Sequence, residues 1–95
     1  MKLELHYRLP GSDKVETEIS RGKSIVGRLL SSQIILNIDS VDPIHAMIDF
    51  QEDGTIAVTD LNSKEGTKVN GQKISKETNL VPGDVVEIGS VALTL

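Results

Sequence analysis

The stretch at residues 46–60, AMIDFQEDGTIAVTD, decides the fold of this chain. From residue 46 to residue 50, an apolar side chain stands at every second position, which is the period of a strand with one buried face. The triplet Glu52-Asp53-Gly54 has the composition of a tight hairpin turn. Residues 55–60 then return with Ile56 and Val58 on the inner face. The stretch therefore predicts a β-hairpin.

The same alternation continues on both sides of this hairpin. Further strands are expected at residues 2–9, 15–20, 24–26, 33–36, 68–69, 72–74, 85–88 and 91–95, and turns at 10–13, 70–71, 82–84 and 89–90. Only residues 75–79 have the composition of a helical turn. About eleven short strands separated by turns predict an all-β protein, an antiparallel β-sandwich.

The composition limits the classes of function. A chain of 95 residues is long enough for one domain with a modest core. The net charge is −4, with both signs interspersed, so the chain lacks the basic face of a direct nucleic-acid or membrane binder. Its aromatic residues, Tyr7 and Phe50, offer no stacking platform for single-stranded nucleic acid. No run approaches the ~20 apolar residues of a membrane helix. We expect residues 1–95 to form a single domain of a longer protein.

Catalysis and metal binding lack support in the sequence. His6 falls on the polar face of the first strand, and His45 has no serine or cysteine partner at a recognised motif spacing. There is no cysteine, two histidines make a poor zinc site, and the aspartates lack the spacing of a calcium loop. We therefore predict no enzyme, no catalytic residue, no metal and no cofactor.

Three short segments stand at the ends of predicted strands. They are Gly27-Arg28, the run from Ser40 to Ala46 (SVDPIHA), and the run from Asp60 to Thr67 (DLNSKEGT) with Val69-Asn70-Gly71 after it. Segments in these places form loops at the rim of a sheet. One arginine among short polar side chains is a combination that binds anions.

The order and spacing of these segments resemble the signature of the forkhead-associated (FHA) domain. The run Gly83-Asp84-x-x-x-Ile88-Gly89 completes the match. The resemblance implies an eleven-strand sandwich whose loops bind phosphothreonine in a partner protein or peptide, without catalysis. The run Gly22-Lys23-x-x-Val26-Gly27-Arg28 is most similar to the N-terminal FHA module of large DNA-damage mediator scaffolds. That similarity implies an N-terminal module and a location in the nucleus, at sites of DNA damage.

The resemblance also assigns roles to residues. Arg28 would present its guanidinium fork to the phosphate, with Lys64, Ser63 and Thr67 assisting. The phosphopeptide-binding positions are Arg28, Ser40, Asp42, Ser63, Lys64, Glu65 and Thr67. The structural motif positions are Gly27, His45, Gly66 and Asn70.

Two of these positions depart from the family pattern. Asp42 stands where the family has a serine that donates to the phosphate, and Glu65 where it has an asparagine that holds the peptide. A like charge at ~4–6 Å costs on the order of 1 kcal/mol near a surface. Either Lys64 offsets these carboxylates, or Arg28 pairs internally with Asp42 and closes the pocket.

Leu29 and Leu30 follow the arginine directly. Either one of them tucks into the sandwich, or both form an interface for a partner or a second copy of the domain. Two hypotheses therefore stay open. The first is a phosphothreonine-binding adaptor. The second is an FHA fold whose phosphate pocket is degenerate at Asp42 and Glu65, and which acts by phosphate-independent protein binding or as a homodimer.

Overall fold

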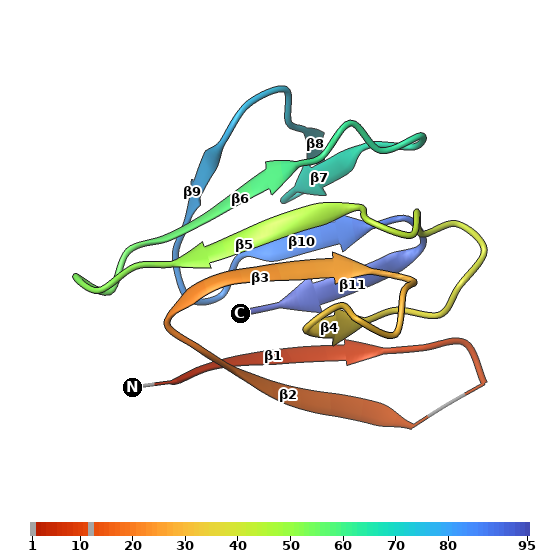
Figure 1. Ribbon diagram of the computed structural model, residues 1–95, viewed down its shortest axis with the longest axis horizontal. Coiled ribbons are helices and arrows are strands. Elements are labelled where there is room, and N and C mark those ends of the chain that lie inside the picture. Colours follow the sequence, from red (N-terminus) through yellow and green to blue (C-terminus); the bar gives the residue numbers. More distant parts are fainter. Residues whose placement is uncertain (1, 12) are drawn as a thin grey trace.

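The computed structural model describes residues 2–11 and 13–95, and these residues form eleven strands and no helix (Figure 1). The strands are β1 (Lys2–Arg8), β2 (Lys14–Ser20), β3 (Gly22–Gly27), β4 (Ile34–Ile35), β5 (Ala46–Phe50), β6 (Ile56–Asp60), β7 (Thr67–Val69), β8 (Gln72–Lys73), β9 (Thr78–Leu80), β10 (Val85–Ile88) and β11 (Val91–Thr94). The all-β prediction is confirmed. Ser12, in the predicted first turn, lies outside the described residues. Within the described part, no helix is available to cross a membrane.

The strands make two sheets that pack face to face. One sheet has six strands in the order β2-β1-β11-β10-β7-β8, and the other has five in the order β4-β3-β5-β6-β9. All pairings are antiparallel except that of β3 with β4, where Val26 stands opposite Ile34 in a parallel register. The strand expected at residues 33–36 is therefore only the two residues of β4, and it runs parallel to β3 instead of antiparallel to it. The Gln33 side chain accepts a hydrogen bond of 2.7 Å from the Ile25 N–H, at the edge of β3 that the two-residue β4 leaves uncovered.

The predicted helical turn at residues 75–79 is wrong. Residues 78–80 instead form β9, which pairs with β6 so that Leu80 stands opposite Ile56. The pairing places Leu80 in the core, where it is 4% exposed. The burial of Leu80 and pairing with the free edge of β6 thus outweigh the helical preference of the polar residues around it.

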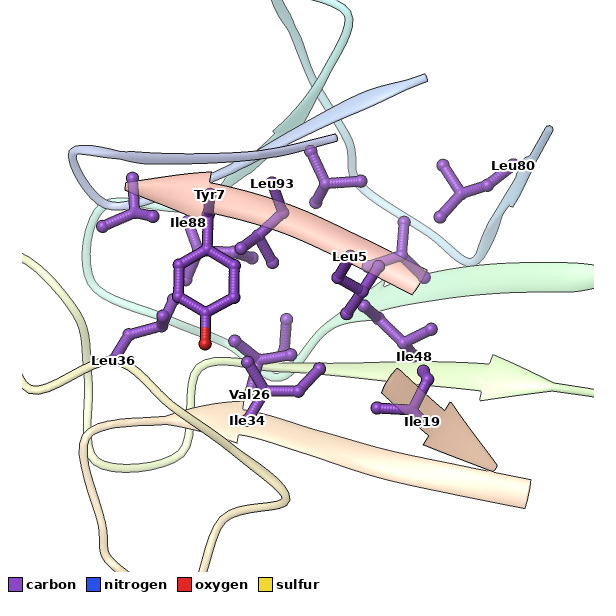
Figure 2. Packing of buried hydrophobic residues seen from close by; sticks show 14 of the residues in the cluster. Leu5, Tyr7, Ile19, Val26, Ile34, Leu36, Ile48, Leu80, Ile88 and Leu93 are labelled. Atoms are coloured by element: carbon purple, nitrogen blue, oxygen red, sulfur yellow. The ribbon is translucent and has the colours of Figure 1, made fainter. Parts of the chain in front are cut away.

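The core lies between the two sheets and consists of aliphatic side chains with two aromatic rings. Figure 2 shows Leu5 and Tyr7 of β1 facing Val26 and Ile48 of the opposite sheet. The Tyr7 hydroxyl shares a hydrogen bond of 3.1 Å with Thr17 Oγ1, so its polar atom is satisfied. The alternation seen in the sequence therefore corresponds to the buried face of each sheet.

The strand register brings several loops to one end of the sandwich. Val26 pairs with Ala46, and Ala46 pairs with Asp60, so β3 ends, β5 begins and β6 ends at the same level. In the other sheet Thr67 pairs with Ile88, which brings the start of β7 and the β10–β11 turn to that end as well. The loops that contain the candidate functional residues lie at this end.

Candidate functional site

Three loops form the candidate site. The first loop is residues 28–33 between β3 and β4, the second is residues 36–45 between β4 and β5, and the third is residues 61–66 between β6 and β7. In Figure 1 they lie at the end of the sandwich where the β3 arrow terminates.

The first and second loops are joined through their backbones. The N–H groups of Arg28 and Leu29 donate to the carbonyls of Asp42 and Pro43, at 3.0 and 3.3 Å. Gly27 makes this approach feasible, because a Cβ atom added there would lie 2.2 Å from the Pro43 carbonyl oxygen. Glycine is therefore required at this position by contact with the neighbouring loop.

Arg28 is anchored at one end of its guanidinium. Its Nε donates to the Val41 carbonyl at 3.0 Å, and Val41 itself is fully buried. Within the described residues, the two terminal nitrogens of Arg28 make no hydrogen bond or ion pair. The side chain is half-buried. Arg28 therefore presents an oriented fork of donors to whatever occupies the rim.

His45 connects the second loop with the third. Its Nδ1 accepts a hydrogen bond of 3.1 Å from the Asp42 N–H, and its Nε2 lies 2.9 Å from the Gly66 carbonyl oxygen. A backbone N–H can only donate, so Nδ1 is the acceptor. Nε2 therefore carries the hydrogen and donates it in the hydrogen bond to the Gly66 carbonyl oxygen. With 0% exposure, His45 is a buried brace between loops and does not face a ligand.

Asp42 is also used within the loops. Its Oδ2 accepts a hydrogen bond of 2.8 Å from the backbone N–H of Lys64. Among the described residues Asp42 forms no ion pair with Arg28, so the interpretation of an internal salt bridge is wrong. The carboxylate holds the third loop against the second and leaves the guanidinium available.

Asp60 organises the third loop. Its carboxylate accepts from the Ser63 N–H at 3.1 Å, from the Ser63 hydroxyl, and from the Thr67 hydroxyl at 2.8 Å. Ser63 Oγ in turn accepts from the Gly66 N–H at 2.9 Å. Burial acts to raise the pKa of Asp60, but the hydrogen bonds from Ser63 and Thr67 together outweigh burial and hold the pKa below its ordinary value.

This network corrects two assigned roles. Ser63 and Thr67 were expected to assist Arg28 at the phosphate, but each gives its only hydroxyl hydrogen to Asp60. Thr67 is also fully buried. Asp60 was not predicted as a site residue, although an aspartate three residues before a serine is a signal for a side-chain-capped turn.

Ser40 and Asn70 make hydrogen bonds to residues outside the three loops. Ser40 Oγ accepts from the Ser90 N–H at 2.9 Å and lies 3.0 Å from Ser90 Oγ, which ties the second loop to the β10–β11 turn. Asn70 donates to Asp84 Oδ1 and accepts from the Val85 N–H, both at 3.0 Å. Ser40 thus connects the second loop to the six-stranded sheet, whereas Asn70 joins the β7–β8 turn to the start of β10 within that sheet.

Lys64 and Glu65 have exposed side chains at the outer edge of the third loop. No ion pair between them occurs among the residues that the structure describes. Lys64 thus adds a positive charge to the exposed side of the third loop, and Glu65 a negative one.

Leu29 and Leu30 are 43% and 86% exposed, so the interpretation that one of them enters the sandwich is wrong. The first loop is held by its backbone bonds to the second loop and by a turn in which the Ser32 N–H donates to the Leu29 carbonyl at 3.0 Å. The adjoining core is already filled by buried side chains, namely Val26, Ile34, Leu36 and Val41.

Other surface features lie outside the three loops. A hollow of about 580 Å³ lies on β1, β2 and β11 and is lined by residues that include His6, Arg8, Lys14 and Thr94. In the described ranges, no group of three or more His, Cys, Asp or Glu side chains is placed to hold a metal ion.

Comparisons with known proteins agree with this geometry. A family model described as the FHA domain matches residues 24–89. An FHA domain of the CT664 protein from Chlamydia trachomatis superimposes with a TM-score of 0.90 at 27% identity, covering 99% of this chain and 95% of that one. A structure from a study of phosphothreonine-dependent FHA domain interactions gives 0.83 at 26% identity, covering 97% and 94%. The FhaA FHA domain, complexed with the intracellular domain of Rv3910, gives 0.82 at 26% identity, covering 96% of each chain. No curated protein matches the sequence.

Proposed function

Because the chain belongs to the FHA domain family, we propose that it is a non-catalytic protein-interaction module that binds phosphothreonine in partner proteins. The observation that carries the proposal is the Arg28 side chain. Its Nε is fixed by the Val41 carbonyl, and its terminal nitrogens remain available at the rim of the described loops.

The chemistry of a phosphate suits this arrangement. A phosphothreonine carries close to two negative charges and three acceptor oxygens, and a guanidinium fork can donate two parallel hydrogen bonds to it. Lys64 supplies a second cation from the third loop. Because His45 and Asp60 already hold the loops in place, binding costs little ordering entropy. Asp42 and Glu65 oppose the anion and lower the affinity.

The relatives support the same function. One solved structure at 26% identity comes from work on phosphothreonine-dependent interactions, and another at 26% identity is a complex with an intracellular protein domain. A nuclear role in the DNA-damage response, and a place at the N-terminus of a longer scaffold, stay predictions.

Binding of a degenerate phosphothreonine peptide library, measured by fluorescence anisotropy, tests the proposal. We expect micromolar binding that Arg28→Ala abolishes and that Arg28→Lys weakens at least tenfold, since lysine offers a point charge in place of a fork. Arg8→Ala, on the exposed end of β1, is the matched control and should bind normally. Equal binding of phosphorylated and unphosphorylated peptides, or full binding by Arg28→Ala, would rule the proposal out.

A second function is favoured by the exposure of Leu30 and by the acids at positions 42 and 65. In this alternative the domain binds a partner, or a second copy of itself, without phosphate. A dimer mass in light scattering together with no phosphopeptide binding would support it over the first.

A further inference from the structure

One edge of the sandwich differs from the others. In the part of the chain that the structure describes, the edge strands of the two sheets are β2, β8, β4 and β9. Three of them are short, with two residues in β8, two in β4 and three in β9. The fourth, β2, has seven residues and lies along the lower border of the molecule in Figure 1. A short edge strand discourages pairing with another chain, and β2 lacks that protection.

The other features that block an edge are also missing from β2. It contains no proline, and its pairing with β1 runs without a bulge through all seven residues. Its inward side chains, Val15, Thr17 and Ile19, carry no charge. Among the described residues, the β2 backbone forms hydrogen bonds only in its ladder with β1. The N–H and C=O groups on the other side of β2 are therefore available to a further strand.

A groove of about 370 Å³ adjoins this edge and is lined by residues of β2, β3 and the first loop, Ile19 and Gln33 among them. β3 is uncovered here because β4 pairs with only its last two residues. The Gln33 side chain, and not a strand, accepts the hydrogen bond from the Ile25 N–H. The groove therefore leaves room beside β2 for the inward side chains of an added strand.

The centre of the outer face at this edge is acidic. Glu16 and Glu18 of β2 are exposed, and Glu18 stands directly opposite Glu4 of β1. Like charges in directly opposite positions destabilise a sheet. Within the described ranges, Glu4 and Glu18 form no ion pair, while Glu16 Oε1 lies 3.6 Å from Nδ1 of His6. A lysine or arginine on an adjoining strand would relieve the repulsion between the glutamates.

We propose that the free edge of β2 binds an extended segment of a partner protein as an added strand. The side chains of such a segment point alternately outward and inward. Those opposite Glu16 and Glu18 face outward and are lysine or arginine, and the one between them lies over Thr17 and is aliphatic. At the end of this face Lys14 stands opposite Arg8, so the basic residues of the segment are confined to its centre.

Charge disfavours a second copy of the domain as the occupant. An antiparallel pairing of β2 with β2 of another copy, over its whole length, is centred on Thr17 and places Glu16 opposite Glu18 twice. A shift of register away from this contact shortens the ladder. A partner segment with basic and aliphatic residues at alternate positions complements the full length of the edge.

The test uses the peptide Ser-Val-Lys-Val-Lys-Val-Ser, which reads the same in both directions and so suits either strand orientation. A scrambled peptide, Lys-Lys-Ser-Val-Val-Val-Ser, is its control. We expect the alternating peptide to bind at least tenfold tighter than the scrambled one, as measured by chemical-shift titration. At saturation, hydrogen exchange of the outward amides of β2 should slow at least tenfold, while the amides of β9 exchange as in the free protein.

Charge reversal at the edge provides the matched variant. The double change Glu16→Lys and Glu18→Lys should weaken binding of the lysine peptide at least tenfold and favour Ser-Val-Glu-Val-Glu-Val-Ser in its place. Glu77→Lys, the same change at an exposed residue beside β9, should bind as the parent protein does. All three glutamates are exposed, so these variants should fold, which thermal unfolding verifies.

Equal binding of the alternating and scrambled peptides, unchanged exchange of the β2 amides, or an unchanged peptide preference after charge reversal would each overturn the inference. A dimer in light scattering whose β2 amides slow with protein concentration alone would show a second copy at the edge, and would overturn it as well. Phosphopeptide binding through Arg28 is a separate measurement, and its result does not bear on this edge.

Discussion

His45 and Gly66 are joined by a fully buried hydrogen bond of 2.9 Å between Nε2 of the ring and the glycine carbonyl oxygen. The other ring nitrogen accepts from the Asp42 N–H, so one neutral imidazole satisfies a backbone donor in the second loop and a backbone acceptor in the third. A fully buried residue thus holds the second loop against the third.

Replacement of this histidine should therefore loosen the loops. His45→Ala leaves the Asp42 N–H and the Gly66 carbonyl without partners and opens a cavity, which should lower the free energy of unfolding by about 2–4 kcal/mol. Urea titration measures the loss, and phosphopeptide affinity should fall with it. His6→Ala, on the half-exposed face of β1, should cost less than 1 kcal/mol. A loss below 1 kcal/mol for His45→Ala would show that the brace is dispensable.

The lowered pKa of Asp60 predicts how the free energy of unfolding depends on pH. Its folded-state pKa lies below the ordinary value of 3.8, because the hydrogen bonds from Ser63 and Thr67 outweigh burial. The carboxylate therefore stabilises the fold fully above its unfolded pKa, and this contribution disappears as the pH falls through the folded pKa. Asp60→Asn should lower the unfolding midpoint at pH 7 and reduce the difference in midpoint between pH 6 and pH 3.

The exposed Glu52→Gln, in the β5–β6 turn, is the control for that pH series and should reproduce the parent curve. If Asp60→Asn shows the same acid loss of stability as the parent protein, the network around Asp60 is not the source of the pH dependence.

Much of the fold followed from local patterns in the sequence. The alternation at residues 46–60 predicted β5, β6 and their turn, since period two places every second side chain inward whatever the partner strand is. The parallel pairing of β4 was missed because a strand of two residues is too short to carry a period. β9 was missed because its formation depends on the free edge of β6, which is distant in sequence.

The candidate site was predicted in its position and only partly in its roles. Glycine and arginine at the end of β3 located it, because the need for close backbone approach is visible in the residue type. Residue type alone does not show which acceptor a hydroxyl group donates to. Only the folded loop places the Asp60 carboxylate beside Ser63 and Thr67. Their hydroxyl groups therefore donate to Asp60 within the protein.

Gly27 provides a steric test of the contact between the first two loops. It is not among the residues with a left-handed backbone, so Gly27→Ala should act only through the clash with the Pro43 carbonyl. We expect a loss of about 2–3 kcal/mol in unfolding free energy and at least tenfold weaker phosphopeptide binding. Gly54→Ala, at φ +90° with nothing within 4 Å, should cost about 1 kcal/mol from backbone strain and leave binding unchanged. Equal effects of both changes on binding would contradict the loop contact.

Neutralising the two acids at the rim should strengthen phosphopeptide binding. Asp42→Asn removes a charge near Arg28 yet keeps an oxygen that can accept from the Lys64 N–H, so the third loop stays in place. Glu65→Gln removes a charge from an exposed side chain without a described partner. Each change should tighten binding about fivefold at low salt, which corresponds to a repulsion on the order of 1 kcal/mol, and the gain should shrink at 0.5 M salt. In Asp42→Ser, by contrast, the shorter side chain reaches the Lys64 N–H less well. Its gain in phosphopeptide affinity should therefore be smaller than that of Asp42→Asn. Calorimetry at two salt concentrations measures all three, and an affinity that ignores both the substitutions and the salt would refute the charge argument.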